Sequence, residues 1–191
     1  MAVTAWIARA ASRPPLLMAA LGSLSGVLSA WIGFAFEPPW LAGVGGVFFL
    51  DAGRVPIGVL FAAAVGGGLA IATLRMVVLP VAAVATMYAW SAAIHAATSI
   101  ITDASDDVRL IVGCLAADAL GAAITHAGGA LVLATLRRFS SLAVTTAVGA
   151  VLGLLYYAGE RNWLDGRLLF VFWQPATAYA IGAGLAKRAS P

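Results

Sequence analysis

The sequence predicts an all-α integral membrane protein, a bundle of six transmembrane helices with both termini in the cytoplasm. Composition, six apolar runs and the distribution of charge support this fold class. Of the 191 residues, 62% are hydrophobic and 10% are charged, whereas soluble domains average about 45–50% apolar and about 25% charged residues. A soluble chain this short cannot bury that much apolar surface. Disorder is excluded because it requires low hydrophobicity.

Six runs are long and apolar enough to cross a bilayer, which takes about 20 residues of helix. Charged and Pro/Gly-rich breaks place them at residues 15–36, 55–74, 77–101, 110–136, 140–158 and 168–186. Backbone groups in lipid have no water to bind, so these runs must close their own hydrogen bonds as helices. They form one transmembrane domain over residues 1–191, in which residues 1–14 are an interfacial N-terminal segment.

The charged residues give the orientation. With the N-terminus inside, the inner segments hold seven of the 11 basic residues and no acid. These basic residues are Arg9, Arg13, Arg75, Arg137, Arg138, Lys187 and Arg188. The outer loops hold the other four basic residues and seven of the eight acids. By the positive-inside rule we expect a multi-pass protein of the cytoplasmic (inner) membrane, with both termini cytoplasmic.

The first outer loop, residues 37–54, contains an apolar run at residues 41–50 that is too short to span. Such a run either lies in the interface or re-enters the membrane. Re-entrant backbone needs protein or a water cavity to satisfy it, so the interfacial placement is favoured.

Aromatic residues gather near the predicted outer boundary. They are Trp40, Phe48, Phe49, Tyr156, Tyr157, Trp163, Phe170 and Trp173. Tyr and Trp are enriched at both membrane–water interfaces, so we expect an interfacial belt that needs no ligand.

Glycines mark the predicted helix contacts, because helices in lipid associate through close van der Waals packing of small residues. Gly22, Gly26 and Gly33 share one face of the first span, and Gly149 and Gly153 repeat the G-x-x-x-G spacing in the fifth. We expect contacts within the bundle, with a dimer contact as the alternative.

Three consecutive glycines, Gly66, Gly67 and Gly68, lie near the middle of the second span. Each weakens a helix by roughly 1 kcal/mol relative to alanine. Close helix packing is the favoured explanation. A local break that lines a site is the alternative, since discontinuous helices at the midplane are a transporter device.

Asp118 is the only acid inside a predicted span. It lies about ten residues past the outer end of its helix, roughly 15 Å deep at 1.5 Å per residue. A carboxylate at that depth costs several kcal/mol unless it is paired, hydrated or protonated, so it marks a candidate functional site. A structural hydrogen bond is the alternative.

The face around Asp118 is small and polar, and it includes Thr125, with His126 at its edge. His95 lies on the preceding span at a similar predicted depth. Helices joined by a short loop pack as antiparallel neighbours, so we expect Asp118 and His95 to meet. Such a pair suits a proton relay or a static hydrogen bond.

The sixth span carries Gln174, Pro175 and Tyr179. Proline inside a helix frees the carbonyl four residues back and commonly kinks the rod. A kink alone is the favoured explanation, and a solute-facing polar site at Gln174 and Tyr179 is the alternative.

Several functional classes are excluded. No segment is long enough for a soluble catalytic domain, and the G-x-S-G and H-E-x-x-H protease patterns are absent, so we expect no enzyme. One cysteine and two histidines predict neither a metal site nor a cofactor. The basic residues form no stripe, which argues against nucleic acid as a partner.

Two functions remain. The first is a binding site or pathway for a small solute or ion, in a transporter, a channel or a membrane-embedded substrate-binding subunit. The alternative is a non-catalytic accessory or assembly subunit of a larger membrane complex. The expected partners are the lipid bilayer and other membrane subunits or a second copy of the chain.

Overall fold

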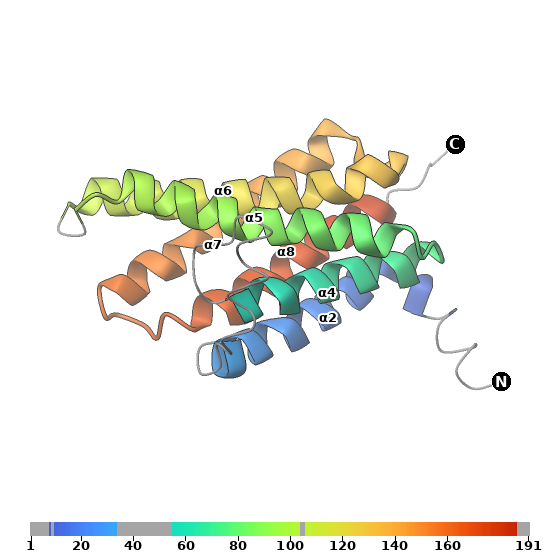
Figure 1. The fold of residues 1–191 in the computed structure, drawn as a ribbon, viewed down its shortest axis with the longest axis horizontal. Coiled ribbons are helices and arrows are strands. Elements are labelled where there is room, and N and C mark those ends of the chain that lie inside the picture. The colour runs from blue at the N-terminus through green and yellow to red at the C-terminus, as the bar shows by residue number, and fades with distance from the viewer. Residues whose placement is uncertain (1–7, 9, 34–54, 104–105, 187–191) are drawn as a thin grey trace.

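The computed structural model describes residues 8, 10–33, 55–103 and 106–186, which form six long helices (Figure 1). The helices are α2 (Pro14–Leu28), α4 (Val55–Thr73), α5 (Val78–Ile100), α6 (Asp107–Val132), α7 (Phe139–Glu160) and α8 (Leu168–Ala186). A π-helical turn, Ser29–Gly33, extends α2. All six are long and apolar enough to cross a membrane, and no strand occurs among these residues. The prediction of six apolar helices is confirmed, and the protein is consistent with a multi-pass membrane bundle.

The six helices close into a ring. Each packs against the helix before and after it in the order α2, α4, α5, α6, α7 and α8, and α8 packs along α2 to complete the circle. Figure 1 shows the helices lying side by side along the long axis of the molecule. The ring leaves an interior that α4, α5, α6 and α8 line together.

The two ends of the bundle differ in charge. The basic end carries Arg13, Arg75, Arg137 and Arg138. The opposite, acidic end carries Asp103, Asp106, Asp107, Glu160 and Asp165, beside Arg109, Arg161 and Arg167. These ends correspond to the predicted inner and outer sides. The apolar segment at residues 41–50, and with it the choice between interfacial and re-entrant placement, lies outside the described residues.

The fourth helix ends earlier than expected, and the predicted boundary at residue 136 is wrong. Helix α6 stops at Val132, because Leu133 is extended and a 3₁₀ turn follows at Ala134–Leu136. The side chain of Arg137 folds back and donates hydrogen bonds to the carbonyls of Ala130 (3.0 Å) and Leu131 (3.1 Å). It thereby satisfies carbonyls that the end of a helix leaves without a partner.

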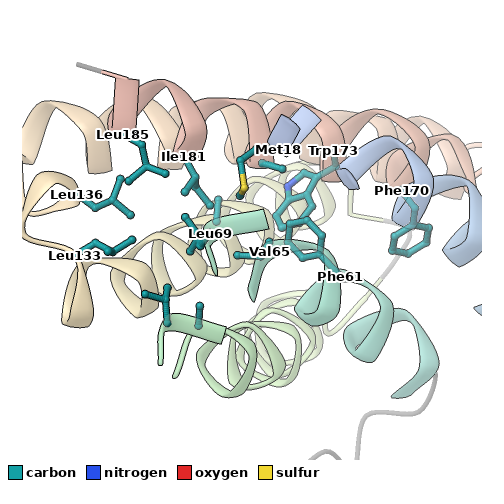
Figure 2. Packing of buried hydrophobic residues seen from close by; sticks show 14 of the residues in the cluster. Met18, Phe61, Val65, Leu69, Leu133, Leu136, Phe170, Trp173, Ile181 and Leu185 are labelled. Atoms are coloured by element: carbon teal, nitrogen blue, oxygen red, sulfur yellow. The ribbon is translucent and has the colours of Figure 1, made fainter. Parts of the chain in front are cut away.

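Bulky apolar side chains fill the interior of the ring (Figure 2). Met18, Val65, Leu69 and Ile181 are all fully buried, and they come from α2, α4 and α8. This contiguous core holds the helices at fixed rotations about their axes. The polar groups described below therefore have defined neighbours.

The interfacial-belt interpretation is wrong for two of its aromatic residues. Phe170 and Trp173 are only 7% and 9% exposed and pack into the core. Both lie within the first two turns of α8, on the face directed at the bundle interior. Trp163 is 68% exposed at the acidic end, which suits an interfacial residue. Trp40, Phe48 and Phe49 lie outside the described residues.

Glycines allow two helix pairs to approach at the backbone. A Cβ atom at Gly22 would lie 2.7 Å from Cα of Pro175, and one at Gly26 would clash with the carbonyl of Phe170. Helix α2 therefore lies directly against α8. A Cβ at Gly149 would lie 2.6 Å from the carbonyl oxygen of Asp118, so α7 approaches α6 equally closely.

The three consecutive glycines do not interrupt α4, which is continuous from Val55 to Thr73. The alternative of a local helix break is therefore wrong. Gly66 lies under the carbonyl of Leu79 on α5, and Gly68 lies against Met18 on α2. Gly67 faces open space. Gly33, at the end of the π-helical turn, packs against Ile57 at the start of α4.

Candidate functional site

Asp118 lies on α6, where α6 crosses α7. Gly153 of α7 makes room for it, because a Cβ at Gly153 would lie 2.8 Å from Oδ2 of Asp118 and 2.6 Å from the carbonyl of Cys114. Within the described part of the chain, no group donates a hydrogen bond to the Asp118 carboxylate and no cation pairs with it. An acid that served only to hold helices together would have such a partner.

The Asp118 side chain lines a cavity inside the ring, here called the inner cavity. Its walls come from α4, α5, α6 and α8, and they enclose a volume of about 40 Å³, which is room for a few water molecules. Most of the wall is apolar. Its polar side chains are Thr86, Asp118, Thr125 and Gln174, and Asp118 is the one ionisable residue.

Three residues of this wall have a buried polar atom without a hydrogen-bond partner. These atoms are Nε1 of Trp90, Oγ1 of Thr125 and Nε1 of Trp173, three of the five such side-chain atoms in the described residues. A buried polar group that lacks a partner costs about 1–3 kcal/mol. Their concentration around one cavity indicates a place where water or a polar ligand supplies the missing bonds.

Four aromatic rings of the same wall form two pairs. Phe61 and Trp173 meet edge to face with ring centroids 5.3 Å apart, and Trp90 and Phe170 meet at 5.9 Å with tilted planes. Figure 2 shows Phe61 beside Trp173 in the interior of the bundle. The rings give the inner cavity a large, rigid aromatic surface.

A second cavity, the outer cavity, continues from the inner one toward the acidic end. It encompasses about 1170 Å³, open solvent included, and reaches the exposed residues Glu160, Asp165 and Arg167. The two cavities have five wall residues in common: Trp90, Ala93, Asp118, Leu169 and Phe170. Asp118 and the Trp90–Phe170 ring pair therefore lie between the two cavities.

The structure does not bring His95 to Asp118, and the predicted pair is wrong. Ala93 of α5 lies against Gly121 of α6, with Ala93 Cβ 3.4 Å from a Cβ placed on that glycine. His95, two residues further on, points about 200° away around the helix. Its side chain is exposed on the outside of the bundle.

His126 does not line either cavity with Asp118. Its side chain instead makes hydrogen bonds at the basic end of the bundle. Its Nε2 lies 2.9 Å from the carbonyl oxygen of Leu136, and its Nδ1 lies 3.0 Å from the hydroxyl of Thr145 on α7. The ring is buried. It thus ties the turn after α6 to the next helix.

Gln174 lies in the wall of the inner cavity, but its side-chain amide is hydrogen-bonded to serines of α2 and its π-helical extension. Ser25 donates a hydrogen bond to Oε1 (2.6 Å), and Nε2 donates to the hydroxyl of Ser29 (3.1 Å). Tyr179 is 48% exposed and lines neither cavity. Of the six predicted site residues, the structure therefore brings together Asp118, Thr125 and Gln174.

Sequence reasoning missed the aromatic part of the site. Trp90 and Phe61 had no assigned role, and Trp173 was assigned to the interfacial belt. Trp90 is 12 residues past the start of its 23-residue helix, near the middle of a predicted span. Tryptophan at that depth must find a partner for its N–H group, and this was a usable signal.

Comparison of the chain with models of known protein families, with curated proteins and with solved structures finds no match.

Proposed function

We propose that this chain is a membrane-embedded binding unit or pathway for a small solute, with its site at the inner cavity beside Asp118. The observation that carries the proposal is an unpaired carboxylate in a cavity that also holds three unpaired buried polar atoms. Binding sites commonly combine a largely apolar wall with a few convergent polar groups. We further propose that the acidic end faces outward and that both termini are cytoplasmic.

The route to the site supports a pathway. The outer cavity leads from exposed residues at the acidic end to Asp118, and the inner cavity continues past it. Ionisable residues inside membrane proteins typically face such water-filled routes. A non-catalytic role fits the same site, because Asp118 has no second ionisable group in the inner cavity with which to share acid–base chemistry.

The alternative of an accessory subunit has less support. Its main argument was the small-residue faces, and these are used inside the bundle: Gly22 and Gly26 against α8, and Gly149 and Gly153 against α6. A partner chain would have to pack on other surfaces.

Cysteine accessibility tests the pathway. In a Cys114→Ala background, Ala93→Cys places a thiol in the wall shared by both cavities, and Leu120→Cys places one on the outside of the bundle near the depth of Asp118. Two permanently charged thiol reagents, a trimethylammonium-ethyl and a sulfonatoethyl methanethiosulfonate, are applied to oriented membrane vesicles. Charged reagents enter water-filled routes and are excluded from lipid.

The expected result is labelling of Ala93→Cys from the acidic end by at least one reagent, with no labelling of Leu120→Cys. If neither reagent reaches Ala93→Cys from either side, the proposed pathway is wrong.

A further inference from the structure

We infer that the solute is a small organic cation, an ammonium group attached to an apolar body, held where the two cavities meet, by Asp118 and the rings of Trp90 and Phe170. This inference rests on the proposed function and adds the chemical class of the ligand. Three independent observations support it: the charge inside the cavity, the chemistry of its wall and the charge at its entrance.

Charge inside the cavity selects for a cation. Asp118 is the one ionisable residue in the wall of the inner cavity, and none of the wall residues is Lys, Arg or His. An anionic ligand would face a carboxylate with no basic group to bind it. A neutral ligand would leave the carboxyl group to be hydrated or protonated, whereas a cation would pair directly with its charged form.

The wall selects an organic cation over a metal ion. No group of three or more His, Cys, Asp or Glu side chains that could hold a metal occurs in the described residues. The rings of Phe61, Trp90, Phe170 and Trp173 line the cavity instead. Aromatic faces attract cations through the ring quadrupole, and quaternary ammonium groups are bound in this way.

The unpaired polar atoms indicate a second feature of the ligand. Indole N–H groups are donors only, and those of Trp90 and Trp173 have no acceptor. The Thr125 hydroxyl can donate or accept. A ligand that carries an oxygen near its ammonium group would supply acceptors for these donor groups.

The entrance favours the same charge. Asp118, Glu160 and Asp165 line the outer cavity against one base, Arg167, which lies 3.9 Å from Asp165. Clefts lined by one sign of charge raise the local concentration of the opposite ion. The acidic end therefore concentrates cations at the mouth of the route.

Choline and its uncharged carbon isostere, 3,3-dimethylbutan-1-ol, are the probes for the first experiment. Both have nearly the same shape and a hydroxyl, and they differ in charge. We expect choline to raise the melting temperature of the purified protein in detergent and to slow labelling of Ala93→Cys, whereas the isostere has little effect. An isostere that matches choline would overturn the cation assignment.

Two substitutions locate the binding groups. Asp118→Asn is expected to weaken choline binding by about tenfold or more, because the quaternary ammonium group, which has no N–H to donate, loses the opposite charge that attracts it. Trp90→Leu is expected to weaken it by about tenfold through loss of the ring face. Asp107→Asn removes a charge at the same end outside both cavities and should leave binding unchanged. Equal effects of Asp118→Asn and Asp107→Asn would overturn the assignment of Asp118.

The thiol reagents provide a measurement that needs no ligand. At Ala93→Cys, the cationic reagent should react faster than the anionic one, after correction for their rates with a free thiol, and Asp118→Asn should reduce that preference. Labelling of Ala93→Cys without any preference would overturn the cation inference and leave the pathway standing. If neither reagent labels Ala93→Cys, the proposed pathway itself is wrong.

Discussion

Among the residues that the structure describes, two that are not glycine adopt a left-handed backbone conformation, and each lies at the end of a helix. Leu74 (φ 55°) follows α4 and Asn162 (φ 58°) follows α7. In each case the next residue donates its N–H to a carbonyl five residues back, Arg75 to Ala70 and Trp163 to Ala158. This is the Schellman geometry, in which glycine is the preferred residue at the left-handed position.

Leu74→Gly is therefore expected to stabilise the protein by about 1 kcal/mol, because a non-glycine residue in this conformation costs roughly 1–2 kcal/mol. The Leu74 side chain is 69% exposed, so little packing is lost. The melting temperature of the purified protein in detergent measures the effect. Asn162→Gly is the control and should give a smaller gain, since asparagine tolerates the conformation. A lower melting temperature for Leu74→Gly would contradict this account.

Two neighbouring glycines of α4 differ in how much space a side chain would have. A Cβ at Gly66 would lie 2.8 Å from the carbonyl oxygen of Leu79, whereas one at Gly67 would meet nothing within 4 Å. The two positions share a helix and a sequence context, so they form a matched pair.

Gly67→Ala is expected to raise stability by up to about 1 kcal/mol, because alanine loses less backbone entropy on folding than glycine. Gly66→Ala is expected to lower stability, because α5 must move away from α4. The melting temperatures of the two variants test these expectations. Equal shifts in the same direction would show that the α4–α5 contact does not constrain Gly66.

At the scale of elements, α2 and α8 are joined by contact of their backbones and by a buried polar bridge. Gln174 binds Ser25 and Ser29 on α2, and both hydrogen bonds are buried. In the ring, this contact closes the circle between the first and last described helices. Pro175, next to Gln174, lies within α8 without ending it.

Gln174→Leu should destabilise the protein by about 2–6 kcal/mol, because it leaves two serine hydroxyls buried without their partner at about 1–3 kcal/mol each. Replacing all three polar groups, with Ser25→Ala and Ser29→Ala added, should recover much of that loss. Thermal unfolding of the single and triple variants provides the measurement. A triple variant that is no more stable than Gln174→Leu would assign the loss to packing instead.

The described part of the molecule is a ring of helices around an apolar core, and the inner and outer cavities lie in its acidic half. The Trp90–Phe170 pair lies in the wall shared by the two cavities. We expect bulky rings at this junction to restrict passage between the cavities by their size.

Phe170→Ala should therefore speed entry into the inner cavity. With Ala89→Cys, which lies in the inner cavity wall alone, the labelling rate from the acidic end is expected to rise severalfold when Phe170→Ala is added. Phe172→Ala, an exposed aromatic two residues further along α8, serves as the control and should leave the rate unchanged. An unchanged rate in Phe170→Ala would show that the ring pair is no barrier.

The six spans could be predicted from the sequence because they depend on local properties. Helix is forced wherever a long apolar run has no water for its backbone, whatever its neighbours are. The boundary at Val132 could not be predicted, because the bonds from Arg137 to Ala130 and Leu131 depend on how the chain turns after the helix. Asp118 was also evident from sequence, since an acid at that depth stands out in composition alone.

Which residues lie near Asp118 depends on the tertiary structure. From the sequence, His95 was predicted to lie at a depth similar to that of Asp118. Depth along a helix does not say in which direction a side chain points around the helix axis. Small residues set that rotation: Ala85 lies against Gly128, and Ala93 lies against Gly121. This packing turns Trp90 toward the cavity and His95 away from it. Sequence alone thus predicted six long apolar helices and the isolated acid, and helix packing decided that aromatic rings, rather than a histidine, line the same cavity as that acid.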